Sequence, residues 1–457
     1  MTSLTTTDFS TASEPPRVPG WPLIGNLLDM AAGPAQFFVK AYRKHGPVFR
    51  ISILGKEYTV LAGVEAANFM GTREGRDSLR SKEFWQGLVN EYGATRTLTG
   101  EDGEPHKELR DIMRRGYSKE SIKGRYNELI KITDQSIERD WKVGEKVPVV
   151  QACQYMVVDQ LGQILTGAAP LEYVADIRTT ILYILNVLVT RQRPKILLKH
   201  PEYRKSKARV MELGEKMIAQ WRATAGTKKD EDKNLIDDIM DAHVRDPKLM
   251  PESDLILTLT GPYVAGLDTV ANTTSAIAYT ILKYPEVHAR VLKEVDELFA
   301  SGEIGEEDLL KRIPSLQGAI METMRLYPIA VAQMRTATRD FVFQGYRVRE
   351  GELLYMGTSV PHFMDEFYPN AMTFDIDRYA KPRAEHLQSG AYSPYGRGPH
   401  TCLGKSLAEV QIALSMARLF YRLDLELPSK NYVLKTKSAP TPGPSMDFRL
   451  KVKGYRN

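Results

Sequence analysis

Apolar residues recur at three- and four-residue spacing through most of the stretch from residue 104 to 300, which predicts a succession of helices. The pattern is interrupted at Gly144–Glu145, at Gly167–Pro170 and at 223–233, where the sequence reads ATAGTKKDEDK. The last interruption is rich in charge and is expected to be a solvated loop. One long apolar helix is predicted from Ser253 to Lys283.

Strands are predicted in short stretches at two places. After a helix over Pro34–His45, the stretch VFRISILGKEYTVLAG alternates β-branched and aromatic residues around Gly55, which predicts a two-stranded hairpin. Beyond Pro328 the stretch RDFVFQGYRVREGELLYMG predicts short strands and loops, and a long amphipathic helix follows over Leu403–Leu423. Because strands and helices do not alternate, the predicted fold class is mainly α with small β-sheets.

The N-terminal residues are polar. Residues 1–14, MTSLTTTDFSTASE, contain neither a basic residue nor an apolar run, so they resemble neither a signal peptide nor a membrane anchor and are predicted to be a disordered tail. Four prolines in PPRVPGWPLIGNLL, residues 15–28, oppose regular helix and predict a stiff connector on the surface. Residues 15–457 are predicted to form a single domain.

Composition narrows the class of protein further. A chain of 457 residues that is 42% hydrophobic can bury a large core. The most apolar window, Ile181–Val189, is far shorter than the roughly 20 residues that span a bilayer, so we expect a cytoplasmic protein without a membrane anchor. The net charge of +5 is not gathered in a basic block with aromatic residues, so no nucleic-acid partner is expected. Two cysteines cannot build a disulfide framework, which agrees with a reducing compartment.

One of these cysteines, Cys402, lies in the stretch SPYGRGPHTCLG. A thiolate is stabilised by positive charge, by a metal or by the amides at a helix N-terminus, and a helix is predicted to begin at Leu403. Gly398 and Gly404 permit positive φ and the close approach of a flat group such as a porphyrin. A Cys-x-Gly sequence alone is more often a buried structural cysteine before a helix. The spacing of the aromatic, glycine and histidine residues around Cys402 favours metal ligation.

The same stretch, from Tyr395 to Gly404, resembles the haem-binding loop of the cytochrome P450 family, of the bacterial soluble type. The family usually has phenylalanine at the position of Tyr395 and arginine at that of His400. The resemblance implies a haem b whose iron is bound by the Cys402 thiolate. It further implies that Tyr395 packs near the sulfur, that His400 bonds to a propionate and that Gly404 gives clearance. In this fold the haem lies between a long central helix and the helix after the cysteine.

A second motif lies upstream in AIMETMRLYP. Glu322 and Arg325 share a helix face and can form an ion pair, and Pro328 ends the helix. Such a pair alone is usually a solvated surface contact. The stretch FDIDRY resembles the family's loop that supplies a second arginine, here Arg378, although Ile376 stands where the family usually has proline. We therefore expect a structural network of Glu322, Arg325 and Arg378 beneath the haem loop.

The predicted central helix contains GPYVAGLDTVANT, which resembles the family's oxygen-activation segment. Asp268 and Thr269 would be costly in a core helix unless they are solvated or hydrogen-bonded, and the alternative is an ordinary polar helix face. The resemblance implies that Ala265 leaves room over the iron, that Thr269 donates a hydrogen bond to bound oxygen and that Asp268 relays protons from solvent. Pro262 and Val270 depart from the usual pattern.

Three further residues are implied by the resemblance to bind the haem propionates. His106 and Arg110 lie four apart in GEPHKELRDIMRRGYS, which is similar to the family's propionate-binding helix, and Arg335 is the other expected partner. Taken alone, a histidine and an arginine on a helix are more often surface residues.

We expect electrons to come from a separate protein, a ferredoxin or a flavodoxin with an NAD(P)H-dependent reductase. Basic residues near the haem loop and the propionate helix can form a docking face for such an acidic partner, and a solvated basic face is an equal alternative. These residues are Lys107, Arg114, Arg115, Lys119, Arg397 and Lys405.

The resemblance implies a haem-thiolate monooxygenase that uses O2 to hydroxylate or epoxidise an apolar small molecule. The alternatives are a peroxide-driven peroxygenase or isomerase of the same fold, and a haem sensor without turnover; the pair Asp268–Thr269 argues against both. Steroids, terpenoids, fatty acids and aromatic compounds all remain open as substrates. The residues expected to line the substrate pocket are Phe84, Leu88, Leu185, Leu188, Tyr263, Val264, Ala265, Ile329 and Val331.

Overall fold

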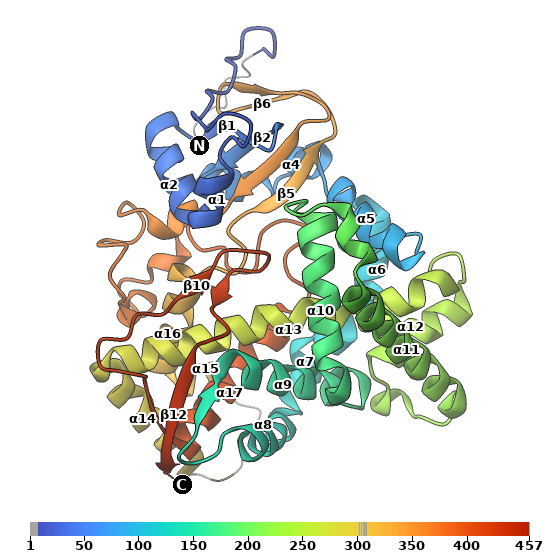
Figure 1. Cartoon of the computed structure of the whole chain (residues 1–457), viewed down its shortest axis with the longest axis vertical. Coiled ribbons are helices and arrows are strands. Elements are labelled where there is room, and N and C mark those ends of the chain that lie inside the picture. The colour runs from blue at the N-terminus through green and yellow to red at the C-terminus, as the bar shows by residue number, and fades with distance from the viewer. Residues whose placement is uncertain (1–7, 301, 303, 305–308, 457) are drawn as a thin grey trace.

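The computed structural model describes residues 8–300, 302, 304 and 309–456. A part rich in strands, at the top of Figure 1, lies on a larger part made mostly of helices. Across these described residues no helix is both long and apolar enough to cross a membrane. The predicted class, mainly α with small sheets, is confirmed.

The main sheet has five strands in the order β1-β2-β8-β5-β3. The predicted hairpin is present as the antiparallel strands β1 (Val48–Ile53) and β2 (Lys56–Ala62). β2 pairs in parallel with β8 (Leu353–Gly357), which pairs antiparallel with β5 (Gln333–Ala337), and β5 pairs with β3 (Leu79–Arg80). Since successive side chains point to opposite faces, both faces of this sheet are apolar and both are covered.

The remaining strands form three small sheets. They are the three-stranded sheet of β4 (Lys146–Pro148), β12 (Arg449–Tyr455) and β9 (Leu423–Glu426), the hairpin of β6 (Phe341–Phe343) and β7 (Tyr346–Val348), and the pair β10 (Thr436–Lys437) and β11 (Gly443–Pro444).

Helices occupy most of the chain between β3 and β5, as the apolar spacing predicts. The helices before the central one are α1 (Leu27–Ala32), α2 (Pro34–His45), α3 (Val64–Phe69), α4 (Arg73–Ser78), α5 (Lys82–Tyr92), α6 (Gly103–Arg114), α7 (Lys119–Lys123), α8 (Tyr126–Asp140), α9 (Val149–Leu161), α10 (Val174–Ile184), α11 (Pro201–Thr224) and α12 (Leu235–Arg245). Those after it are α14 (Pro285–Ala300), α15 (Leu309–Arg312), α16 (Pro314–Leu326) and α17 (Lys405–Arg422). A π-helical turn, η4 (Leu185–Val189), continues α10, and a short 3-10 helix, η5 (Lys195–Lys199), follows.

The central helix α13 runs from Glu252 to Lys283, one residue longer than predicted, and crosses the helical part in Figure 1. It packs against α9, α11, α16 and α17, and most of its residues are buried. Pro262 lies inside the helix without ending it. α13 therefore forms the axis of the helical core.

The N-terminal tail differs from its prediction. We expected residues 1–14 to be disordered; residues 1–7 lie outside the described part, but the chain from Asp8 onward is packed. Ala12 is buried, and Ser13 exchanges backbone hydrogen bonds with the β6–β7 hairpin. Glu14 forms ion pairs with Arg349, Arg347 and Arg50. A polar segment is thus ordered by arginines that lie far away in the sequence.

Candidate functional site

Cys402 lies in the loop that precedes α17, which begins at Lys405. Its backbone N–H donates to the carbonyl oxygen of Tyr395 at 2.9 Å, which closes the loop. The Cys402 side chain is exposed, yet burial is the main cause that raises the pKa of its thiol. Exposed area together with strong desolvation indicates a side chain that faces an interior space rather than the outer surface.

The central helix also has an exposed residue in buried surroundings, at the alanine that is expected to leave room over the iron. Ala265 is exposed, whereas Leu267 and Asp268 beside it are buried. Because α13 is buried over most of its length and packs against α17, this exposed alanine indicates an open interior space next to the helix. Thr269, one turn further on, is half-buried.

Two groups near Cys402 oppose the effect of burial on the pKa of its thiol. The Gly404 N–H and the positive charge of Arg110 both lower the pKa of the Cys402 thiol, although burial outweighs them. The amide belongs to the residue just before α17, where backbone N–H groups are not used within the helix. The surroundings therefore favour a bound cation at the sulfur over a free buried thiolate.

Four basic side chains gather around a single carboxylate on this side of the molecule. Nε2 of His400 lies 2.8 Å from Oδ1 of Asp102, and the rings of His106 and His400 are 4.2 Å apart. Arg335 is buried and donates to the backbone oxygen of the adjacent Met334 at 2.7 Å. Burial first, then the neighbouring positive charges of His400 and Arg110, lower the pKa of His106 to about 4.

The pKa values of Arg335 and His400 are also shifted within this cluster. Burial lowers the pKa of Arg335 to about 10, with Asp102 acting in the opposite direction. Burial also lowers the pKa of His400, against the hydrogen bond that its ring donates to Asp102. Because the pKa values of both histidines are lowered, the charge balance is two arginines against one carboxylate. This excess of positive charge is unfavourable in a desolvated site without a further anion. The cluster is thus suited to bind an anionic group.

The two glycines of the loop differ from each other and, in part, from their expected role. Gly398 has φ +75°, and a Cβ on it would lie 2.3 Å from the backbone oxygen of Met70. Its clearance therefore serves the approach of another backbone segment, not of a flat ligand. Gly404 has ordinary φ, and a Cβ there would meet only Tyr117 at 3.7 Å and the Cys402 sulfur at 3.9 Å.

A buried ionic network lies below the loop. Arg325 donates to both carboxylate oxygens of Glu322, at 2.8 and 2.7 Å, and Nε of Arg378 donates to Oε1 at 3.2 Å. All three side chains are almost completely buried. The residues that the sequence predicts to form a network therefore meet in the structure, where α16 contacts the turn that carries Arg378.

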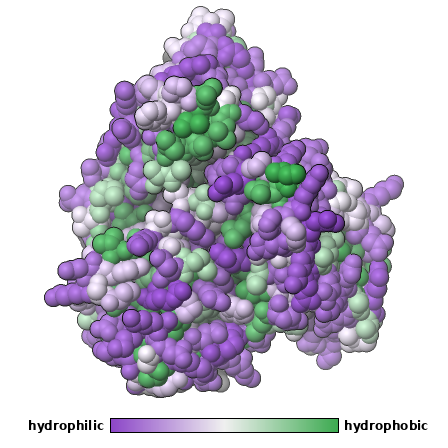
Figure 2. Space-filling model, viewed as in Figure 1, coloured by the Kyte–Doolittle hydropathy of each residue, from purple (hydrophilic) through white to green (hydrophobic). Residues whose placement is uncertain are grey.

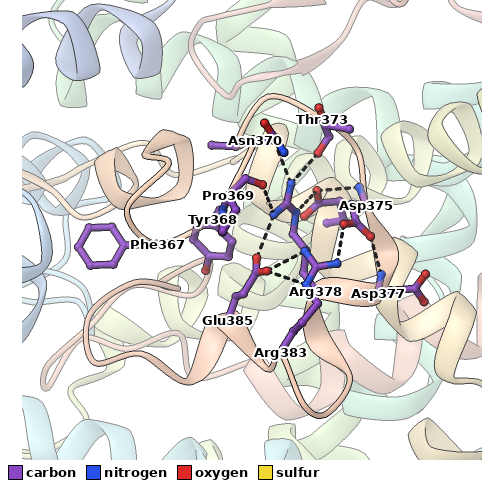
Figure 3. Close-up of polar contacts among 12 residues, drawn as sticks. Phe367, Tyr368, Pro369, Asn370, Thr373, Asp375, Asp377, Arg378, Arg383 and Glu385 are labelled. Carbon is purple, nitrogen blue, oxygen red and sulfur yellow. Dashed lines mark hydrogen bonds and ion pairs between the residues drawn. The ribbon is translucent and has the colours of Figure 1, made fainter.

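Further groups complete this network. The Tyr379 hydroxyl and the Asp375 N–H also donate to Glu322, at 2.7 and 3.0 Å. Figure 3 shows how Arg378 reaches Glu385 and three backbone oxygens, while Arg383 joins Glu385 to Asp375. Ile376, which replaces the usual proline, is buried against Gly318 of α16. Its substitution does not displace Arg378.

Asp268 lies in a second buried polar site, formed by residues that the sequence did not indicate. Gln154 of α9 donates to Oδ1 at 2.7 Å, and Nε of Arg178 on α10 lies 4.0 Å from the same oxygen. Oδ2 of Asp268 and Nε of Arg178 have no hydrogen-bond partner among the described residues. Burial lowers the pKa of Lys437 on β10, whereas the charge of Asp268 raises it.

The Thr269 hydroxyl is bonded within its own helix. It donates to the carbonyl oxygen of Ala265 at 2.7 Å, the usual internal bond of a threonine in a helix. The helix is continuous through this turn. To donate to a ligand in the interior space, the hydroxyl has to leave that carbonyl.

The expected pocket residues fall into two adjoining groups. Phe84 and Val331 belong to one apolar cluster, and Leu88 and Leu188, with Leu185 packed on them, belong to another. Trp85 and Met334 contact both clusters and join them. Val264 and Ile329 are half-buried.

Tyr263 departs from the predicted pocket. Its hydroxyl is 2.7 Å from that of Thr166, and the ring belongs to the helical core.

Tyr395, in the cysteine loop, is partly buried. Its hydroxyl lies 3.9 Å from the sulfur of Met324.

The six basic residues expected to form a docking face are in different environments. Arg115 is paired with Asp238 of α12, Lys107 with Glu104, and Arg397 donates to Ser393 and Tyr392 within its own loop. Lys405 is exposed and lies 3.9 Å from a carboxylate oxygen of Glu409. Arg114 and Lys119 are exposed and form no ion pair with a described residue, so these two stay available as a basic surface beside the cysteine loop.

The family model described as Cytochrome P450 matches residues 15–446 of this chain. The chain belongs to the cytochrome P450 family. It is therefore an oxidoreductase enzyme, and the family implies a haem-thiolate iron cofactor.

Several P450 relatives are similar to this chain. A sterol 14alpha-demethylase of Mycolicibacterium vanbaalenii is 34% identical over 181 residues, which are 38% of this chain and 40% of that protein. A beta-amyrin 28-monooxygenase of Saponaria officinalis is 25% identical over 96% of this chain and 91% of that protein. The heme domain of cytochrome P450DA has a TM-score of 0.83 at 20% identity, covering 97% of this chain and 98% of that one. Cyanobacterial CYP120A1 with retinoic acid bound has a TM-score of 0.80 at 22% identity, covering 96% and 99%.

The residues present fit the P450 cofactor. A haem brings a metal cation for the Cys402 sulfur and two carboxylates for the basic cluster of His106, Arg110, Arg335 and His400. The open space at Ala265 and Cys402 is where a flat group can lie. The basic cluster is the observation that discriminates, because among the described residues the buried Arg335 donates to a neighbouring backbone oxygen alone, and such burial is otherwise costly.

Sequence reasoning missed several residues of the site. Asp102 orders the basic cluster, Tyr117 lies beside the cysteine loop, and Gln154, Arg178 and Lys437 surround Asp268. No motif marks them. The isolated Asp-Gly at 102–103, just before the propionate helix, is the one local signal that could have been used, since Asp is favoured before a helix.

Proposed function

We propose that this P450 is a monooxygenase that hydroxylates or epoxidises an apolar small molecule with O2 and electrons from a separate ferredoxin or flavodoxin served by an NAD(P)H-dependent reductase. The single observation that carries the proposal is the exposed Cys402 sulfur, set in the interior beside a cluster of basic groups with one carboxylate. The cytoplasm, where thiols stay reduced, suits such a ligand.

Cys402 is proposed to bind the iron, and His106, Arg110, Arg335 and His400 to bind the two propionates. The bound haem supplies oxygen activation and transfer of one oxygen atom to a C–H or C=C bond. Because His400 is held by Asp102, its ring has a fixed orientation before the cofactor arrives. Such preorganisation avoids an ordering cost on binding.

Asp268 and Thr269 are proposed to handle protons on the other side of the cofactor. Asp268 has one oxygen held by Gln154 and one free of partners among the described residues, so it can exchange a proton without breaking its anchor. Arg178 and Lys437 offer the carboxylate alternative cationic partners. Thr269 can pass a proton once its hydroxyl turns away from the Ala265 carbonyl.

The substrate is proposed to be apolar, held by the two joined clusters that contain Phe84, Leu88, Leu188 and Val331. Both clusters present apolar side chains, so binding is proposed to rest on apolar area and shape. A sterol and beta-amyrin are named for two relatives, and these compounds are the first to test here.

The reduced, CO-bound spectrum tests the ligand assignment. Wild-type protein is expected to give the Soret band typical of thiolate ligation, and Cys402→Ala to lose it. The matched control Cys153→Ala removes the chain's other cysteine, which is buried in the helical core, and should keep the band. A histidine-type band in the wild type would sink the proposal.

Turnover separates the monooxygenase from its alternatives. Product is expected with O2, NAD(P)H, a reductase and a ferredoxin or flavodoxin, and little product with hydrogen peroxide alone. The reverse result would favour a peroxygenase. The expected difference rests on the Asp268–Thr269 pair, which a peroxide-driven reaction does not need.

A further inference from the structure

The Asp102 carboxylate joins the basic cluster to helix α5. Its Oδ1 lies 2.8 Å from Nε2 of His400, and its Oδ2 accepts a hydrogen bond from the backbone N–H of Ser81 at 2.8 Å. Ser81 is buried and directly precedes α5, on which the expected pocket residues Phe84 and Leu88 are buried. Asp102 therefore contacts a residue expected to bind the cofactor and the start of a helix expected to contact the substrate.

Asp102 stands where an aspartate usually serves its own helix. It is the residue before α6, and an aspartate at that position usually accepts hydrogen bonds from the free N–H groups of the first turn. Among the described residues, its side chain makes no such capping bond. Burial raises the pKa of this carboxyl, but the bonds with His400 and Ser81 lower it further, to below its ordinary value. Asp102 thus stays charged and uses both oxygens to join distant segments.

The segment from Ser81 to Asp102 forms a closed loop that begins with α5. The hydrogen bond from Ser81 to Asp102 joins its two ends. Within the loop, the backbone N–H and the hydroxyl of Thr95 donate to the buried Asp254 in the first turn of α13, at 2.6 and 2.7 Å. One carboxylate therefore holds this loop to the central helix, and another holds it to the basic cluster.

The position of α5 determines one wall of the proposed pocket. Gly87 lies so close to the π-helical turn η4 that a Cβ on it would be 3.0 Å from the Cβ of Leu188. Figure 2 shows apolar side chains near the upper end of α10, where η4 contacts α5. α5 also contacts β5, the strand that carries Arg335. Because packing this close leaves little free space, a shift at the start of α5 would move the pocket wall.

We propose that Asp102 is a positioning residue that couples the binding of the haem propionates to the position of α5, and through α5 to the binding of an apolar substrate. The inference rests on the proposed function, in which His400 binds a propionate and α5 contacts the substrate. A propionate fixes His400, His400 fixes Asp102, and Asp102 holds the N–H at the start of α5. Because coupling between binding sites is reciprocal, a ligand that packs on α5 also affects the propionates.

Two ligands with the same iron-binding ring test the position of α5. Imidazole binds the iron only, whereas clotrimazole adds a bulky group of aromatic rings that needs apolar space beyond it. In the holoprotein, Asp102→Ala should weaken clotrimazole binding about tenfold, because a hydrogen bond to a charged group is lost, and imidazole binding by less than about twofold. Absorbance titration of the Soret band measures both. Equal effects on the two ligands would refute the coupling.

Matched variants separate this link from a general change of charge. Glu104→Gln removes the carboxylate of an exposed residue of α6 close to Asp102 in the sequence, and it should bind clotrimazole like the wild type. Asp102→Asn keeps an oxygen that can accept from the Ser81 N–H, so it should restore most of the affinity that Asp102→Ala loses. A loss in Glu104→Gln as large as that in Asp102→Ala would contradict the proposal.

A double-mutant cycle tests whether His400 acts on α5 through Asp102. His400→Phe removes the partner of Asp102 but keeps a ring against His106, and it should weaken clotrimazole more than imidazole. In the Asp102→Ala background this effect should vanish, because the link is already broken. Thr95→Val, which removes one bond of the same loop to α13, is the control, and its effect should add to that of His400→Phe. Additive effects of His400→Phe and Asp102→Ala would show that no coupling exists.

Reciprocity gives a spectroscopic readout at the cofactor. The resonance Raman bands of propionate bending should differ between the clotrimazole and imidazole complexes of the wild type, and they should coincide in Asp102→Ala. A residue that only stabilised its own loop would not relay this signal. Identical propionate bands in the two wild-type complexes would exclude the coupling.

The CO-bound spectrum of every variant keeps this inference separate from the proposed function. If all variants keep the thiolate band and bind clotrimazole like the wild type, the coupling is refuted and the proposed function stands. A wild type without the band would refute the proposed function itself. If Asp102→Ala does not retain haem, His400→Phe and Asp102→Asn carry the same comparison of clotrimazole with imidazole.

Discussion

Glu322 and Asp268 are both buried carboxylates with arginine beside them, yet their hydrogen bonding differs. Five donors reach the two oxygens of Glu322, from Arg325, Arg378, Tyr379 and Asp375. Within the described part of the chain, Asp268 receives one hydrogen bond, from Gln154. Its nearest arginine nitrogen is 4.0 Å away. The same chemical group is thus saturated at one place and left partly free at the other.

This difference indicates different tasks. A carboxylate with every lone pair used cannot change protonation without breaking several bonds, so Glu322 is suited to hold segments together. A carboxylate with one oxygen that has no partner among the described residues, beside the cationic groups of Arg178 and Lys437, can gain or lose a proton at small structural cost. The number of donors therefore separates a structural acid from a candidate proton carrier better than burial does.

The largest effect is expected from Glu322→Gln. The neutral amide leaves Arg325 buried without its countercharge and Arg378 with Glu385 alone, which should lower the free energy of unfolding by about 3–5 kcal/mol. Denaturant unfolding monitored by circular dichroism measures the change. A loss below about 1 kcal/mol would show that the saturation of Glu322 does not stabilise the fold.

In contrast to Glu322→Gln, Asp268→Asn should change the stability little and the activity strongly. Because the amide can keep the Gln154 contact, the free energy of unfolding should change by less than about 1 kcal/mol. Product formation should fall about 100-fold, with more peroxide per O2 consumed, because a general acid is lost. Steady-state turnover and peroxide yield are the measurements. Strong destabilisation with normal coupling would make Asp268 a second structural acid.

Arg378→Lys tests how much the geometry of the buried network around Glu322 stabilises the fold. A lysine keeps the charge but cannot reach Glu322, Glu385 and three backbone oxygens at once. The expected loss is about 2 kcal/mol of unfolding free energy. Arg383→Lys, a more exposed arginine of the same loop, is the matched control and should cost less than about 1 kcal/mol.

The smallest effect concerns Glu14, a third carboxylate among arginines, at the surface. Its pKa is lowered from 4.5 to about 2, first by the hydrogen bond from Arg349. A lowered pKa means that these pairs stabilise residues 8–14 above pH 4.5 and are lost as the pH falls toward 2. Hydrogen-exchange protection of residues 8–14 should decline over that range in the wild type. Glu14→Gln should show weaker protection that does not depend on pH there.

The sequence predicted the local elements well and the long-range contacts only where a family motif described them. α2, the β1–β2 hairpin and α13 follow from apolar spacing within one segment. Arg325 was found as the helical neighbour of Glu322, whereas Arg378 was found through a resembling loop. The apolar periodicity of a segment predicts which of its faces is buried, but it does not predict which side chains from distant segments come into contact.

The residues around Asp268 show why the rest was missed. The site takes one side chain from each of three elements: Gln154 from α9, Arg178 from α10 and Lys437 from β10. No sequence motif links these three residues. Gly398 was assigned to ligand clearance because the backbone of Met70, far away in sequence, was not foreseen beside it. The disorder predicted for residues 8–14 failed for the same reason, since Arg349 and Arg347 supply the order.

The parallel pairing of β2 with β8 has a consequence for synthesis. Thr59 lies opposite Leu354, so almost 300 residues have to be translated before β2 gains its second neighbour. Until then the nascent chain carries an apolar strand with an open edge, which invites pairing with other chains. Production of this protein should therefore respond to slower translation, lower temperature and more chaperone, even when its finished fold is stable.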